Sequence, residues 1–201
     1  TQISIDVAKR LDGEIVNADS MQVYKGLRVI TAQPSDEEMS QAPHHLFGYR
    51  DPADAGSAGS WLKDAQSVIR GIQMRGRVPI IIGGTGLHLL ALVKGLSEIP
   101  PIPDEVRTQV RTLVQSIGTE EAHARLTEID PDAASKIKPK DRQRIMRGLE
   151  VHTATGKPLS SFQGDRTPPI LSPGEWVGVA LTPPRAKLYA RIDRRFAGML
   201  M

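Results

Sequence analysis

Four groups of residues in the sequence have side chains and spacings that could do chemistry. The first, Asp19-Ser20-Met21-Gln22, directly follows residues 14–18, EIVNA, which predict a short buried strand. In open α/β sheets, ligands bind beyond the carboxyl ends of the strands. An ionised aspartate at such a strand end accepts a proton or holds a hydrated Mg²⁺ ion. Asp19 is equally suited to cap a short following helix, and its position alone does not separate the two roles.

The second group is Gly83-Gly84-Thr85-Gly86, between an apolar strand pattern and a helix expected from Leu87 to Lys94. Glycines let the backbone approach a ligand, and a helix N-terminus offers free N–H groups to an anion. A tight turn between strand and helix explains the same glycines without a ligand. Both interpretations stay open on this motif alone.

The third group is Pro43-His44-His45. Adjacent histidines on a strand point to opposite faces and do not easily chelate one metal ion. The pair therefore indicates a structural role, with the imidazoles bonded to neighbouring loops.

The fourth group is basic. Six cationic residues and only one acid, Asp141, occur between residues 136 and 147: Lys136, Lys138, Lys140, Arg142, Arg144 and Arg147. This density suits a nucleic-acid backbone, although a solvated helix start is the alternative. Helical spacing places Gln143, Arg144 and Arg147 on one surface, with Ile145 facing inward. Amides and guanidinium groups recognise base edges and phosphates. A second basic cluster lies in the last helix, from Arg185 to Arg195.

The composition limits the classes of protein. The chain has 201 residues, 39% hydrophobic and 24% charged, which suits one large domain or one domain with an insertion. The absence of cysteine excludes disulfides, thiolate metal sites and cysteine nucleophiles. A net charge of only +3 means that nucleic-acid affinity would need local clusters. Val78–Ile82 is too short an apolar run to cross a bilayer, and no signal peptide opens the chain, so a cytoplasmic protein is expected.

Hydrophobic periodicity predicts the elements that would position these groups. Strands are expected over 14–18, weakly over 45–49, over 78–82 and over 175–181. Helices are expected over 2–11, 57–76, 87–94 and from 188 to 200. The β-branched run 78–82 indicates a parallel strand covered on both faces, and the alternation indicates a doubly wound α/β core.

Residues 104–163 show no strand pattern. They predict short helices near 104–116, 119–128, 131–136 and 139–155, flanked by the proline-rich segments 95–103 and 164–173. We therefore expect an α/β core over 1–102, a helical insertion over 103–163 and a return to the core over 164–201. The first and last helices carry no capping signals, so a fragment of a longer protein is expected.

Five stretches, taken together and in order, resemble the tRNA dimethylallyltransferase (tRNA isopentenyltransferase) family: GEIVNADSMQVYKGL (13–27), TAQP (31–34), APHHL (42–46), RGRVPIIIGGTGLHLLALVKGL (75–96) and DRQRIMRGLEVHTATGKPLS (141–160). The resemblance implies a P-loop NTPase-like, nucleotide- or ATP-binding parallel sheet flanked by helices, with an all-helical insertion that grips the tRNA anticodon stem-loop. It implies transfer of a dimethylallyl group from dimethylallyl diphosphate to N6 of the adenine 3′-adjacent to the anticodon. Mg²⁺ is the implied cofactor, and a monomer is expected.

The resemblance also assigns roles to residues. Asp19 matches the general base. Contacts to tRNA are implied for Asp19, Ser20, Met21, Gln22, Thr85, Arg107, Gln143, Arg144, Ile145, Met146 and Arg147. Thr1 falls where the final Ser/Thr of the P-loop stands. This match implies that Thr1 has a catalytic role and binds diphosphate and Mg²⁺.

The sequence departs from the family pattern at several places. No glycine-rich P-loop precedes Thr1, and the family's C-terminal portion does not follow Met201. We therefore expect this chain to bind diphosphate weakly and to be inactive by itself. Ile30 and Gln33 stand where the family has Gly and Lys, and His88 replaces a Tyr.

Three other functions are compatible with the same fold. An adenylate-type isopentenyltransferase would prenylate a free nucleotide and would need less of the helical insertion. A P-loop small-molecule kinase would turn over ATP without prenyl transfer. A non-catalytic RNA-binding protein would keep the basic insertion and lack the P-loop.

Overall fold

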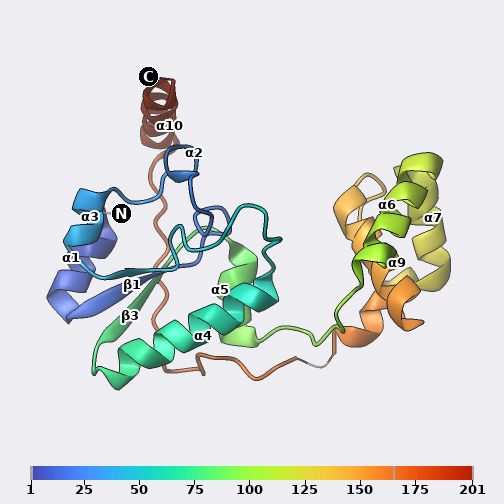
Figure 1. Cartoon of the computed structure of the whole chain (residues 1–201), viewed down its shortest axis with the longest axis horizontal. Helices are drawn as coiled ribbons and strands as arrows, with labels where there is room; N and C mark the ends of the chain where they lie inside the picture. The colour runs from blue at the N-terminus through green and yellow to red at the C-terminus, as the bar shows by residue number, and fades with distance from the viewer. Residues whose placement is uncertain (1, 165, 201) are drawn as a thin grey trace. The chain divides into compact units, whose positions relative to one another are not determined.

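A parallel sheet forms the centre of the first of two compact units. The computed structural model describes residues 2–164 and 166–200, and its contacts divide the chain into Thr1–Lys94 with Pro169–Met201, and Gly95–Pro168. Three strands occur among the described residues: β1 (Gly13–Asn17), β2 (His44–His45) and β3 (Val78–Ile82). All pairings are parallel and the order is β2-β1-β3 (Figure 1). The predicted parallel α/β core is confirmed.

Helices pack on both faces of this sheet, as the apolar periodicity predicts. On one face, Ile5 and Ala8 of α1 (Gln2–Leu11) pack with Ile15 of β1. On the other, Trp61 and Ala65 of α4 (Ala58–Met74) belong to a second apolar cluster, while α1 and α4 lie on opposite sides of the sheet in Figure 1. The sheet therefore has covered faces, which leaves its carboxyl edge for a site.

The first unit holds four more helices: α2 (Arg28–Thr31), α3 (Asp36–Ser40), α5 (Gly86–Lys94) and α10 (Arg185–Met199). Helices α2 and α3 are too short to show apolar periodicity, and the sequence analysis missed them. Ser35 caps α3 by accepting a hydrogen bond from the Glu38 N–H, while the Glu38 carboxylate accepts from the Ser35 N–H. That capping box is a readable signal for a helix start.

The named elements of the second unit, among its described residues, are all helices. The unit contains α6 (Asp104–Ile117), α7 (Thr119–Ile129), α8 (Pro131–Ala134), α9 (Arg142–Thr155) and the 3₁₀ helix η1 (Leu159–Phe162), which confirms the predicted helices. Helix α9 begins three residues later than expected because Asp141 caps it, accepting a hydrogen bond from the Arg144 N–H at 3.2 Å. Buried Asp130 accepts bonds from Ala133 N–H (3.0 Å) and Ser160 N–H (2.8 Å), which ties α8 to η1.

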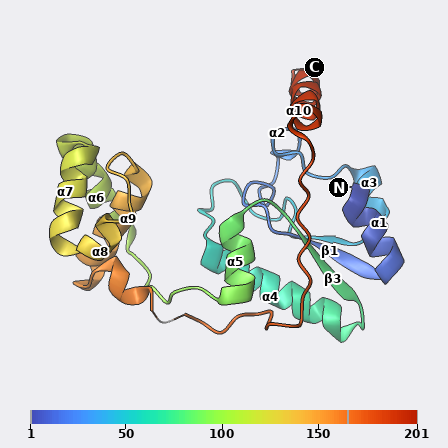
Figure 2. The ribbon, with the colours of Figure 1, turned by 180° about the vertical axis from the view of Figure 1, so that it is seen from behind.

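One strand prediction is wrong. Residues 175–181 form no strand, and Val177 (92%) and Val179 (82%) are exposed, because no described backbone pairs with this segment. Figure 2 shows the orange-red segment leading into α10 as coil. Strand 78–82 forms where predicted and contacts both α1 and α4, but it is less buried than expected. Val78 is 42% exposed and the rest of β3 is half-buried, because β3 has only β1 as a neighbour among the described strands.

Of the predicted strand 45–49, only His45 lies in a strand, because β2 spans His44–His45. Leu46 follows β2 with a φ of 63°, which lies in the left-handed region and breaks the extended backbone. Among the described residues, no helix is both long and apolar enough to cross a membrane.

A buried carboxylate joins β1, β2 and the end of α4. Glu14 is only 3% exposed at its side chain and accepts hydrogen bonds from Arg75 Nη2 at 2.7 Å and Nε at 3.1 Å. The His45 ring lies 2.6 Å from the same carboxylate. The hydrogen bonds from Arg75 are the main cause that lowers the pKa of Glu14 from 4.5 to about 2, burial opposes them, and His45 adds to them.

The substitution Glu14→Gln is expected to destabilise the fold by about 3 kcal/mol at neutral pH, because it removes the ion pairs of the buried carboxylate with Arg75 and Arg77. The folded pKa lies below the unfolded one, so the ion pair contributes fully above pH 4.5. This contribution is lost as the pH falls toward 2. Urea unfolding at several pH values should show the gap between the two proteins narrowing over that window. A gap that stays constant from pH 7 to pH 2 would contradict the role of Glu14.

Candidate active site

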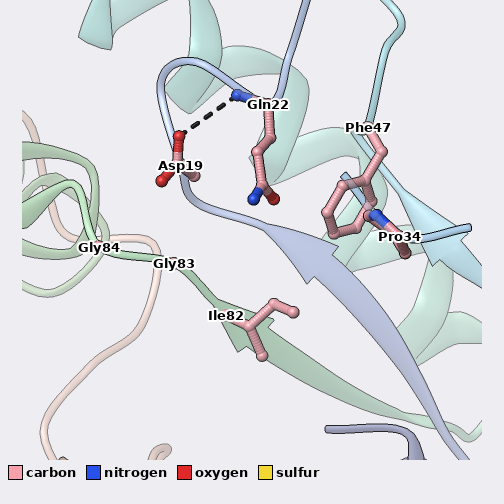
Figure 3. A pocket seen from close by; sticks show the side chains of 7 residues that line it. All are labelled: Asp19, Gln22, Pro34, Phe47, Ile82, Gly83 and Gly84. Carbon is pink, nitrogen blue, oxygen red and sulfur yellow. Dashed lines mark hydrogen bonds between the residues drawn. The ribbon is translucent and has the colours of Figure 1, made fainter. Parts of the chain in front are cut away.

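The carboxyl ends of β1 and β3 meet at an open pocket. The Ala18 N–H donates to the Ile82 carbonyl at 2.6 Å, which holds the two strand ends together. Beyond them lies a pocket of about 280 Å³, lined by Asp19, Gln22, Pro34, Phe47, Ile82, Gly83 and Gly84 (Figure 3). This is the edge where ligands bind in parallel α/β sheets.

Asp19 caps no helix, because α2 begins only at Arg28, and its side chain instead holds a turn and lines the pocket. Its Oδ1 atom accepts hydrogen bonds from the N–H groups of Met21 (2.8 Å) and Gln22 (3.3 Å), so it stabilises the turn after β1. The side chain is half-buried and lines the pocket, as Figure 3 shows. A carboxylate held through one oxygen in this way can use the other to accept a proton.

Thr85 joins the glycine turn to the Asp19 turn. Its hydroxyl accepts a hydrogen bond from the Ser20 N–H at 2.9 Å and donates to the Ser20 hydroxyl at 3.2 Å. Met21, on the same turn, is 53% exposed. The structure therefore brings together five residues to which the resemblance assigns roles: Asp19, Ser20, Met21, Gln22 and Thr85.

Gln22 anchors the loop on the far side of the pocket. Its amide donates hydrogen bonds to the carbonyls of Thr31 (3.0 Å) and Ala32 (3.1 Å). Gln33, one of the departures from the family pattern, donates to the Tyr24 carbonyl at 2.7 Å and does not line the pocket. Ile30 is 67% exposed on α2. The neutral Gln33 side chain thus stabilises the loop backbone through its hydrogen bond to Tyr24.

Gly83 has no room for a side chain. A Cβ atom at this position would lie 2.4 Å from the Ala18 carbonyl carbon and 2.7 Å from the Asp19 nitrogen, both backbone atoms. We expect Gly83→Ala to push the Asp19 turn away from β3, with a loss of stability of about 1–3 kcal/mol. Thermal unfolding of Gly83→Ala and of Gly84→Ala measures this, because a Cβ at Gly84 meets nothing within 4 Å. Equal stability of the two variants would contradict the close packing at Gly83.

The adjacent histidines have the structural role that the sequence indicated. The Nδ1 atom of His44 lies 2.7 Å from the Ala42 carbonyl, and His45 bonds Glu14. Among residues 2–164 and 166–200, no three His, Asp or Glu side chains are grouped to hold a metal ion. A Mg²⁺ ion here would take most of its ligands from phosphates and water, with Asp19 as the carboxylate that lines the pocket.

The second unit carries the other predicted RNA contacts. Lys136, Lys138, Lys140, Arg142, Gln143 and Arg144 are exposed around the start of α9. Arg147 is half-buried 3.8 Å from Glu150, and half-buried Arg107 lies on α6. Ile145 is fully buried in the core of this unit and Met146 packs against that core, so the Ile145 side chain cannot touch RNA as predicted. The buried Ile145 instead holds the helix that presents its charged neighbours.

Two further residues belong to the site and were missed in the sequence. Asn17, a polar residue fully buried under Asp19, ends strand β1. Phe47 forms the wall opposite Asp19 (Figure 3). The available signal for Asn17 was an asparagine at the end of a buried strand. No signal in the sequence pointed to Phe47. Thr1 lies outside the described residues.

Comparisons with known proteins place the chain in a family. The model of the IPP transferase family matches residues 22–201. The tRNA dimethylallyltransferase of Hyphomonas neptunium is 52% identical over 199 residues, which cover 99% of this chain and 63% of that protein. That of Parvibaculum lavamentivorans is 50% identical over 98% of this chain and 62% of its own length. The chain thus spans a little under two thirds of these relatives.

Solved structures of related enzymes support the same family. The tRNA isopentenylpyrophosphate transferase of Bacillus halodurans is 36% identical with a TM-score of 0.57, covering 98% of this chain and 60% of that one. A eukaryotic dimethylallyltransferase that acts on tRNA is 28% identical with a TM-score of 0.76, covering 99% of this chain and 49% of that one. The matched family model, the parallel sheet flanked by helices and the shared fold together show that this chain belongs to the IPP transferase family.

Proposed function

We propose that the protein transfers a dimethylallyl group from dimethylallyl diphosphate to N6 of the adenine 3′-adjacent to the anticodon of tRNA. The observation that carries this proposal is the carboxylate of Asp19, which lines an open pocket at the sheet edge beside Gly83 and Gly84. The relatives support the reaction, since they are tRNA dimethylallyltransferases.

Asp19 is the general base in this proposal. The adenine N6 amine is a weak nucleophile because its lone pair is delocalised into the ring. N6 forms a bond to the allylic carbon, the carbon–oxygen bond to diphosphate breaks, and Asp19 Oδ2 takes the proton that N6 loses. Such proton transfer accelerates a reaction by about 10²–10⁴-fold. Oδ1 stays bonded to Met21 and Gln22 and keeps the carboxylate in place.

The diphosphate leaving group needs positive charge and N–H donors. Gly84 and Gly86 are open glycines at the N-terminus of α5, where backbone N–H groups favour an anion. Mg²⁺, when bound, neutralises charge that develops on the leaving oxygen. Thr1 is the residue proposed to bind that ion and the diphosphate.

The basic surface of the second unit is the proposed tRNA contact. Its exposed members Lys138, Lys140, Arg142 and Arg144 bind phosphates without reading sequence, and Gln143 offers an amide to base edges. The target adenine must leave its stack, which costs a few kcal/mol. Backbone contacts of this kind offset part of that free energy. Because tRNA is the substrate, the reaction is proposed for the cytoplasm, and we expect the protein to act as a monomer.

A competition assay tests the substrate. The complete protein is incubated with labelled dimethylallyl diphosphate, an anticodon stem-loop and AMP at equal concentrations, and the prenylated products are separated. We expect label in the stem-loop alone. Label in AMP would support the adenylate-type enzyme, ATP consumption with a phosphorylated acceptor would support a kinase, and RNA binding without any transfer would support the non-catalytic protein.

A further inference from the structure

The backbone beneath Asp19 is held by the amide of Asn17. The side chain of Asn17 is fully buried. Its Nδ2 atom donates to the carbonyls of Asp19 (3.1 Å) and Leu46 (2.9 Å), and its Oδ1 atom accepts from the Asp19 N–H (2.9 Å). Both amide hydrogens and the side-chain oxygen of Asn17 are therefore bonded to backbone atoms of two separate segments.

The carbonyls just before Asp19 are held in the same manner. Trp61 Nε1 donates to the Asn17 carbonyl at 3.0 Å. The His88 ring stacks on Trp61, with centroids 4.1 Å apart and planes 2° from parallel, and bonds the Ala18 carbonyl. Burial is the main cause that lowers the pKa of His88. Every carbonyl from residue 17 to residue 19 thus meets a side-chain donor.

Asn17 also reaches the opposite wall of the pocket. Leu46, whose carbonyl it binds, has a φ of 63°, an uncommon conformation for a residue with a side chain. A conformation of this kind persists only where its surroundings hold it. The next residue, Phe47, lines the pocket across from Asp19 (Figure 3). One buried amide is therefore bonded to both segments that face each other over the pocket.

We propose that Asn17 is a positioning residue that sets the Asp19 carboxylate relative to the Phe47 wall. Asn17 does not line the pocket, so it acts through these two neighbours. The inference rests on the proposed function, in which Asp19 takes the proton from adenine. A misplacement of about 1 Å in a catalytic group reduces the rate up to about 100-fold, so loss of the amide is expected to act on kcat.

The test compares three substitutions in the complete protein. Asn17→Ala removes all three hydrogen bonds, and Asn17→Ser keeps a hydroxyl that can accept from the Asp19 N–H. Tyr49→Phe is the matched control, because it removes a 2.6 Å hydrogen bond to Asp64 in the same unit without touching the pocket. For each, kcat and KM for prenyl transfer to a stem-loop are measured together with the unfolding midpoint.

We expect Asn17→Ala to lower kcat by about 10–100-fold with KM within about threefold, and Asn17→Ser, which keeps only the acceptor, to recover only part of the loss. Tyr49→Phe should lower stability and leave kcat unchanged. A folded Asn17→Ala protein with wild-type kcat overturns the proposal. If Asn17→Ala does not fold, Asn17→Ser decides: a kcat below that of Tyr49→Phe supports the role, and an equal kcat overturns it.

A double substitution separates this inference from the function on which it rests. If Asn17 acts through Asp19, then Asn17→Ala adds almost nothing to the defect of Asp19→Asn. If the kcat defects of the two single variants multiply in full in the double variant, the positioning role is overturned. Wild-type turnover by Asp19→Asn alone would instead refute the base assignment, whatever Asn17→Ala does.

Discussion

Asp19→Asn is expected to reduce prenyl transfer by at least about 100-fold while tRNA binding stays close to wild type. An asparagine keeps a side-chain oxygen for the N–H groups of Met21 and Gln22, so the turn survives. What it loses is the negative charge that accepts a proton. Single-turnover transfer of a labelled dimethylallyl group, with binding measured separately, gives both quantities.

The control for this substitution is Asp6→Asn, which removes a carboxylate from the exposed face of α1 in the same unit. It should leave turnover unchanged. Transfer within a few-fold of wild type by Asp19→Asn would remove Asp19 from the role of base.

The double substitution Arg144→Ala and Arg147→Ala is expected to weaken stem-loop binding about tenfold or more and to flatten its salt dependence. Each lost phosphate contact lowers the slope of log K against log salt by about one. Arg144 is exposed, and its neighbour Asp141 lies 3.5 Å away without burying it. Filter binding from 50 to 300 mM salt, a range chosen around physiological ionic strength, measures the slope.

Arg125→Ala, on α7 of the same unit, removes one positive charge outside the basic cluster and serves as the control. Its slope should match that of the wild type. An unchanged slope in the double variant would show that phosphates do not contact this surface.

Apolar periodicity predicted most of the elements. Ile15 and Val16 mark β1, Trp61, Ala65, Ile69 and Ile72 mark the buried face of α4, and both patterns record burial that the structure shows. The pattern failed over 175–181, because a strand also needs a partner backbone, and apolar residues alone do not supply one. Short helices such as α2 carry too few residues to show a period.

The site was predictable in part. Asp19 and Gly83 stand at strand ends, where the parallel topology brings them together, so their joint position followed from two local patterns. The role of Asn17 depends on contacts with Leu46, 29 residues away, and on the left-handed turn there. No local pattern encodes such a contact. Ile145 shows the opposite case. It lies inside the stretch that matches the family's tRNA-binding residues, yet its side chain is buried in the core of the second unit.

The most direct test of the account is a crystal structure of the complete protein with an anticodon stem-loop and an unreactive analogue of dimethylallyl diphosphate. The account predicts that the adenine leaves its stack and that its N6 atom lies about 2.6–3.2 Å from a carboxylate oxygen of Asp19. An adenine that stays stacked in the loop, or an N6 atom that bonds another residue while Asp19 faces solvent, would contradict it.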